Sequence, residues 1–180
     1  DYFLIGARTF ADIQTTRSRD QEMWVLKGAA KPGDRPLALD HKISEGVAIS
    51  KRSMKIAWSN TRGQYPDLLA QDESVIFTAE IVYDGAQPRL VNRKEVIRAK
   101  APECTLEAQD FRRNDTELVY TCYRSPFADV FGIDLASGKV TVYRKVSGEY
   151  NEVEGIFPDG EYALVESSRD QREQNSNYID

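Results

Sequence analysis

Residues 154–170 read EGIFPDGEYALVESSRD, and this stretch has the form of a β-hairpin followed by a polar corner. Pro158, Asp159 and Gly160 supply a fixed φ, a side-chain acceptor and a residue that tolerates positive φ, which together are typical of a tight turn. The flanking residues are largely aliphatic, β-branched or aromatic, as hairpin strands require. Whether this unit recurs along the chain decides the architecture.

Two earlier stretches follow the same frame. Residues 44–62 read SEGVAISKRSMKIAWSNTR, and residues 106–124 read LEAQDFRRNDTELVYTCYR. These two copies align without gaps, whereas the copy at residues 153–169 is shorter. Each copy begins near a Glu, runs through a short apolar strand to a polar turn, and returns through a second strand that ends at an Arg. The hairpin therefore occurs three times.

Sequence for two more strands follows each of the first two hairpins. These strands are predicted at residues 74–85 and 88–97, and then at residues 129–138 and 139–146. The start of the chain matches the second, third and fourth strands of an incomplete first unit, at residues 1–8, 21–28 and 35–40. Residues 177–180 match the beginning of the third strand of the last unit. A unit of four antiparallel strands that recurs every ~40–50 residues is typical of a propeller blade.

We therefore predict an all-β fold, a β-propeller segment of about three blades that is truncated at both ends. The predicted blade pieces are residues 1–40, 41–101, 102–148 and 149–180. A β-sandwich of about a dozen strands is the alternative, because its strands recur at a similar spacing. Residues 94–101, KEVIRAKA, are the one short helix candidate and are better explained as the continuation of a strand.

The third hairpin also resembles a known repeat. FPDGEYALVESSRD is similar to the repeat of TolB-like (WD-repeat-like) β-propellers, in which an aromatic residue and Pro-Asp-Gly precede a strand that ends in Arg-Asp. The other two copies match its spacing and lack its Pro-Asp-Gly. The resemblance implies a propeller, and this family includes protein-binding periplasmic propellers, domains that gate serine peptidases, and pectate-fragment lyases. Because a fold does not define an activity, the resemblance leaves function open.

Composition narrows the possible partners. Hydrophobic residues make up 41% of the chain and charged residues 29%, which is typical of a soluble globular domain. A net charge of −5 argues against nucleic-acid binding, and no apolar run is long enough to span a membrane. With one His and two Cys, a Cys/His zinc site is nearly excluded. We expect Cys104 and Cys122 to be small buried thiols, with a disulfide as the alternative.

Strand pairing places the repeated charged residues on one rim. Counting outward from the turns predicts the pairs Ile49–Ile56 and Glu45–Asn60 in the first copy, and Phe111–Leu118 and Glu107–Cys122 in the second. An Arg lies two residues beyond each of these Glu partners. Because first strands line the channel of a propeller, we expect an acidic arc near its mouth and a basic arc close outside. The acidic arc would contain Glu45, Glu107 and Glu154, and the basic arc Arg8, Arg62, Arg124 and Arg169.

Two roles for these arcs remain open. Each Glu can pair with an Arg and so join neighbouring blades, since Arg suits bidentate pairing with carboxylates. Alternatively, the carboxylates can hold a cation such as Ca²⁺, and the arginines a uronic acid sugar or a peptide carboxylate. His41 is predicted at the entry to the strand of Glu45, where it is a weaker candidate for ligand binding.

The sequence therefore predicts a binding module of a periplasmic or secreted protein, with a protein or a charged small molecule as its ligand. Neither a nucleophile elbow nor a glycine-rich phosphate loop is present. The enzyme alternative is a propeller domain of a hydrolase or oligouronide lyase whose catalytic residues lie largely outside this segment.

Overall fold

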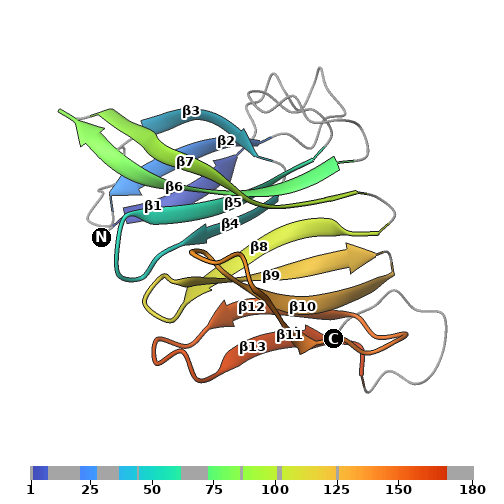
Figure 1. The fold of residues 1–180 in the computed structure, drawn as a ribbon. Helices are drawn as coiled ribbons and strands as arrows, with labels where there is room; N and C mark the ends of the chain where they lie inside the picture. Colours follow the sequence, from blue (N-terminus) through green and yellow to red (C-terminus); the bar gives the residue numbers. More distant parts are fainter. Residues whose placement is uncertain are drawn as a thin grey trace.

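The computed structural model describes residues 2–7, 21–27, 37–43, 45–61, 73–85, 87–100, 103–124 and 126–169. These residues form antiparallel sheets (Figure 1). The first sheet contains β1 (Tyr2–Ala7), β2 (Gln21–Lys27) and β3 (Leu37–Ile43), and the second contains β4 (Glu45–Ile49), β5 (Lys55–Thr61), β6 (Glu73–Asp84) and β7 (Gln87–Lys100). The third contains β8 (Thr105–Arg112), β9 (Glu117–Arg124), β10 (Phe127–Asp134) and β11 (Val140–Arg144), and the fourth contains β12 (Asn151–Ile156) and β13 (Ala163–Ser167).

The four-stranded antiparallel unit predicted from the repeat is confirmed in the second and third sheets. Residues 94–100 belong to β7, so the segment considered as a helix does continue a strand. The β8–β9 turn shows how the local sequence forms the hairpin, because Arg113, Asn114 and Asp115 all have positive φ. Asn and Asp tolerate this conformation better than most residues do. The predicted strand at residues 177–180 lies outside the described residues.

A β-bulge interrupts the first strand of each of the three repeated hairpins, β4–β5, β8–β9 and β12–β13, and corrects the predicted register. The closing pair Ile49–Ile56 is confirmed, but the bulge in β4 places Glu45 opposite Ser59 rather than Asn60. In β8 a bulge places Glu107 opposite Thr121 rather than Cys122. Each bulge adds one residue to the first strand, so a count outward from the turn overshoots by one.

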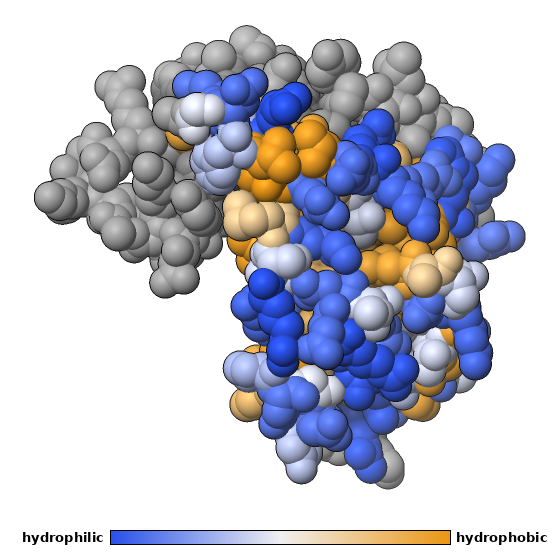
Figure 2. Space-filling view, turned by 60° about the vertical axis from the view of Figure 1, so that its left-hand side comes forward, coloured by the Kyte–Doolittle hydropathy of each residue, from blue (hydrophilic) through white to orange (hydrophobic). Residues whose placement is uncertain are grey.

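The apolar core is divided among the spaces between sheets. One cluster joins Leu39 of β3 to Trp58 and its neighbours in the second sheet. A second cluster joins Ala57 and Ile76 to Leu118, and a third joins Val119 and Val130 of the third sheet to Val153 and Ile156 of β12. A sandwich would have one shared core between two stacked sheets. The separate cores instead fit blades that stand side by side. On the face seen in Figure 2, the surface of the described residues is largely hydrophilic.

Buried polar groups also join the sheets. The Asp110 side chain on β8 is buried, and its Oδ2 accepts hydrogen bonds from Lys51 Nζ at 2.6 Å and from Ile156 N at 2.8 Å. Its Oδ1 accepts from Phe111 N at 2.8 Å. One carboxylate therefore connects the β4–β5 turn, β8 and β12.

Cys104 and Cys122 form a disulfide, with their Cα atoms 5.2 Å apart, so the expectation of two free thiols is wrong. That expectation rested on the pair Glu107–Cys122. The bulge in β8 shifts Cys122 opposite Leu106 and brings it within reach of Cys104, which lies just before the strand. Both cysteines are buried. Within the described residues, no helix is long and apolar enough to cross a membrane.

Candidate functional site

The first strands of successive hairpins, β4, β8 and β12, lie next to one another and carry the three glutamates of the predicted acidic arc (Figure 1). Glu45 and Glu107 occupy equivalent positions in their hairpins. Each lies beyond the bulge of its first strand, where Glu45 is opposite Ser59 and Glu107 is opposite Thr121. Glu154 lies in the bulge of β12. The side chain of Glu45 is outside the described part of the structure, so the complete arc stays a prediction.

Glu154 belongs to an acidic cluster that the sequence did not predict. Carboxylate oxygens of Glu152, Glu154 and Glu166 all lie within 4.8 Å of one another. Glu152 and Glu166 are directly opposite on β12 and β13, and the bulge at residue 154 turns a second β12 carboxylate toward the same place. Glu154 is exposed, whereas the other two are half-buried. The alternation in residues 151–156, NEVEGI, could have indicated part of this cluster, because it places Glu152 and Glu154 on the same face of a regular strand.

Residues from β8, and one that precedes β12, fix one member of this cluster. Gln109 Nε2 donates to Glu152 Oε1 at 2.8 Å and to Thr121 Oγ1 at 3.2 Å. The Tyr150 hydroxyl donates to Glu152 Oε2. Glu152 is therefore held from two sides.

The electrostatics of the cluster favour an added positive charge. Burial raises the pKa of Glu166, and a hydrogen bond to Glu154 and the charges of Glu154 and Glu152 raise it further. Burial likewise raises the pKa of Tyr150, as do its hydrogen bond to Glu152 and the negative charges of Glu152, Glu166 and Glu107. Glu107 thus contributes to the same negative field as the cluster. Like charges held this close disfavour full ionisation, and a cation would relieve the repulsion.

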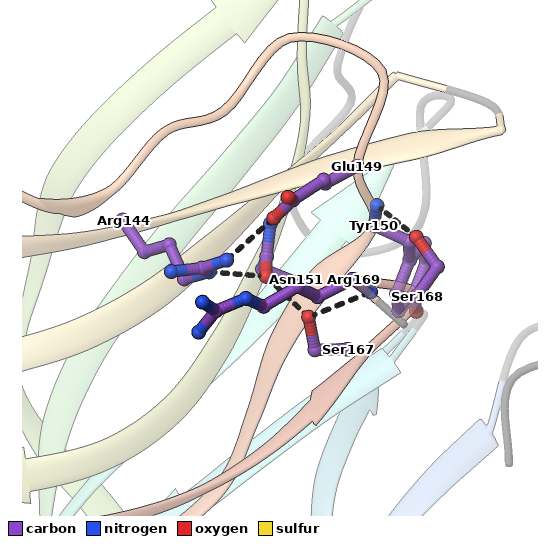
Figure 3. Close-up of polar contacts among 7 residues, drawn as sticks. All are labelled: Arg144, Glu149, Tyr150, Asn151, Ser167, Ser168 and Arg169. Carbon is purple, nitrogen blue, oxygen red and sulfur yellow. Dashed lines mark hydrogen bonds and ion pairs between the residues drawn. The ribbon is translucent and has the colours of Figure 1, made fainter. Parts of the chain in front are cut away.

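The arginines of the predicted basic arc have different surroundings. Arg124 on β9 forms an ion pair with Asp129 on β10, whose side chain is only 2% exposed. Since β9 and β10 are neighbours in one sheet, this ion pair joins strands of one blade. Arg169 follows β13 and donates its backbone N–H to Ser167 Oγ at 3.3 Å (Figure 3). Arg8 and Arg62 lie outside the described residues.

A further arginine, which does not belong to the predicted basic arc, joins the last two sheets. Arg144 donates to Asn151 Oδ1 and to Glu149 Oε2, both at 2.5 Å (Figure 3). The fully buried Asn151 also accepts a hydrogen bond from Ser167 Oγ at 2.7 Å. Arg144 and Asn151 therefore hold β11 against the β12–β13 hairpin.

His41 lies within β3, the last strand of the first sheet, and not at the entry to β4 as predicted. The strand continues to Ile43 because the ladder with β2 extends to that residue. The side chain of His41 is not among the described groups.

Two hollows lie close to the last hairpin. A cavity of about 260 Å³ separates the third sheet from the β12–β13 hairpin, and its lining includes Val119, Val130, Val153 and Val165. A second hollow of about 180 Å³ lies among the hairpin turns, with Lys51, Arg113 and Pro158 on its walls. The first is lined largely by apolar side chains, and the second is polar.

The arrangement of the sheets is similar to that of TolB proteins. TolB from Acinetobacter baumannii aligns with 94% of this chain and 36% of its own, at 15% sequence identity and a TM-score of 0.64. A putative TolB from Agrobacterium tumefaciens aligns with 82% of this chain and 47% of its own, at 20% identity and a TM-score of 0.51. No protein-family model and no curated protein sequence matches the chain.

These likenesses confirm the predicted fold class, an all-β TolB-like propeller segment. The chain spans less than half the length of either solved protein. At sequence identities of 15% and 20%, the likeness establishes the fold and not the function. The function therefore has to be inferred from the residues of the site.

Proposed function

We propose that this chain is a binding module, a propeller segment that recognises a protein or a small charged ligand through the face carrying the glutamates. The observation that supports this proposal is the cluster of Glu152, Glu154 and Glu166. Glu152 and Glu166 face each other across an antiparallel ladder, and directly opposed like charges destabilise such a pair. Polar arrangements that reduce stability are expected at functional sites, where contacts elsewhere in the protein compensate for them.

The chemistry of the cluster suits a cationic ligand group. Carboxylate oxygens are preferred ligands of Ca²⁺ and also pair with Lys or Arg side chains. Arg124 of the predicted basic arc is better explained by a structural role, because its guanidinium already forms an ion pair with Asp129. The recognition surface that we propose is therefore centred on the cluster of Glu152, Glu154 and Glu166, with Glu107 nearby.

The disulfide supports a periplasmic or extracellular location for this module. Cys104 and Cys122 are bonded and buried, and disulfides persist in oxidising compartments while they are rare in the cytosol. A surface that recognises partners outside the cytoplasm agrees with this placement.

Calorimetric titration of the 180-residue chain with Ca²⁺ and with a small uronate tests the proposal. We expect Ca²⁺ to bind and the E154Q/E166Q double variant to bind it at least about tenfold more weakly, because two of three carboxylates are lost. Glu103 is exposed and lies outside the cluster, so E103Q is the matched control. Equal Ca²⁺ affinity in the double variant and in E103Q would remove the cluster from the proposal. Uronate binding that is lost in Arg169→Gln would restore the basic arc as a ligand site.

A further inference from the structure

The outer strands of the two complete blades are strongly basic. Residues 87–100 contain five Lys or Arg residues and one acidic residue, and residues 139–146 contain three Lys or Arg residues and no acidic residue. These two segments therefore carry a net charge of +7, whereas the whole chain carries −5. They contain β7 and β11, which are the fourth strands of their sheets, so no further strand of a four-stranded blade follows them (Figure 1). We call their cations the basic edge, which consists of Arg89, Arg93, Lys94, Arg98, Lys100, Lys139, Arg144 and Lys145.

Half of these cations are not used within the described part of the protein. Lys94 Nζ donates to Leu135 O at 3.0 Å, so β7 lies against the β10–β11 turn and the two outer segments adjoin. Four other side chains are exposed and form no ion pair with a described residue, namely those of Arg89, Lys100, Lys139 and Lys145. Their charges are therefore available to an anionic partner, and the closeness of the two segments lets one partner meet both.

Exposed valines lie among the cations of β11. Val140 is 43% exposed and Val142 is 57% exposed. Their partners on β10 are Ile133 and Phe131, which belong to the core between the second and third sheets or pack against it. Charges that serve to prevent edge pairing can have either sign and need no exposed apolar side chains beside them. Cations of one sign together with exposed apolar side chains are instead typical of a surface that binds membranes.

We propose that the basic edge binds an anionic lipid surface. Its lysines and arginines meet the anionic headgroups, while Val140 and Val142 enter the boundary between headgroups and acyl chains. A soluble anionic polymer would contact the same cations and leave the valines in water, so it explains less of the surface. The inference goes beyond the proposed function, because the glutamate cluster lies on β12 and β13 and contributes nothing to the basic edge.

Cosedimentation of the 180-residue chain with lipid vesicles tests the inference. We expect the chain to bind vesicles of phosphatidylcholine and phosphatidylglycerol in equal parts, and not to bind vesicles of phosphatidylcholine alone. Added salt should weaken binding, because it screens exposed charges. K139Q and K145Q should each weaken binding about fivefold, as expected for one cation near an anionic membrane. R52Q is the matched control and should bind like the wild type, because Arg52 is equally exposed but lies in the β4–β5 turn.

A further variant distinguishes a lipid surface from a soluble polymer. Because Val142 is largely exposed, Val142→Ser should leave the fold intact, which circular dichroism checks. We expect it to weaken vesicle binding about threefold, since part of the apolar surface of one valine is no longer buried in the lipid. Unchanged binding of V142S would show that the basic edge recognises anionic polymers, and would overturn the inference. Equal binding of both kinds of vesicle, binding of neither, or equal weakening by R52Q and K139Q would also overturn it.

Discussion

Replacing Asp110 with alanine should be among the most damaging single changes in the second half of the chain. The carboxylate is 6% exposed and accepts hydrogen bonds from Lys51 Nζ, Ile156 N and Phe111 N. Alanine leaves the backbone donor of Ile156 without its acceptor, and an unsatisfied buried donor costs about 1–3 kcal/mol. The ion pair adds less than 1 kcal/mol, because the Lys51 side chain is 48% exposed and well solvated. We therefore expect a loss of about 3 kcal/mol in the free energy of unfolding.

Urea denaturation followed by tryptophan fluorescence measures this loss, since Trp58 is completely buried between the first two sheets. Asp159→Ala is the matched control, because Asp159 is exposed and, among the described residues, its side chain accepts just the N–H of Glu161 in the same turn. The control should change stability by less than about 1 kcal/mol. If D110A is no more destabilised than D159A, Asp110 does not link the sheets in the way described.

Three further outcomes are expected. Gly132→Ala should destabilise the chain by about 1–3 kcal/mol in thermal melts, because a Cβ at residue 132 would lie 2.5 Å from Glu117 Oε1. Reduction of Cys104–Cys122 should lower stability by about 3 kcal/mol, as the loop of 18 residues gains freedom, and dithiothreitol should not affect a C104A/C122A variant. The raised pKa of Glu166 gives stability that is present at acidic pH and is lost as the pH rises through that pKa. E166Q should therefore match the wild type near pH 4 and exceed it by about 0.5 kcal/mol at pH 7 in urea titrations, and equal stability at both pH values would contradict this sign.

The hairpin repeat was predictable because its signals are local. Pro158, Asp159 and Gly160 mark a turn whatever surrounds them, and alternation in the flanking strands identifies the pairing partners near that turn. Ile49–Ile56 is correct for this reason, since it lies next to the turn and before the bulge. Four-strand periodicity then indicated the propeller.

Features that depend on bulges could not be read in the same way. No glycine marks the bulge in β8, whereas Gly155 adjoins the bulge in β12, and each bulge shifts every pair beyond it by one place. The disulfide was missed because the predicted register placed Cys122 opposite Glu107. The acidic cluster was missed because its third member, Glu166, is contributed by β13 and meets Glu154 only through the bulge. Long-range contacts of this kind are set by tertiary geometry.

A carboxyl-carbon NMR titration of the glutamates tests whether Glu152, Glu154 and Glu166 form one binding site. We predict that Ca²⁺ shifts the carboxyl resonances of Glu152, Glu154 and Glu166 together, while that of Glu103 stays unchanged. We also predict that the apparent pKa of Glu166 lies above its ordinary value and falls in E154Q, because the hydrogen bond and charge of Glu154 help to raise it. An ordinary pKa for Glu166, together with three carboxyl resonances that do not respond to Ca²⁺, would contradict the claim that the three carboxylates form one binding site.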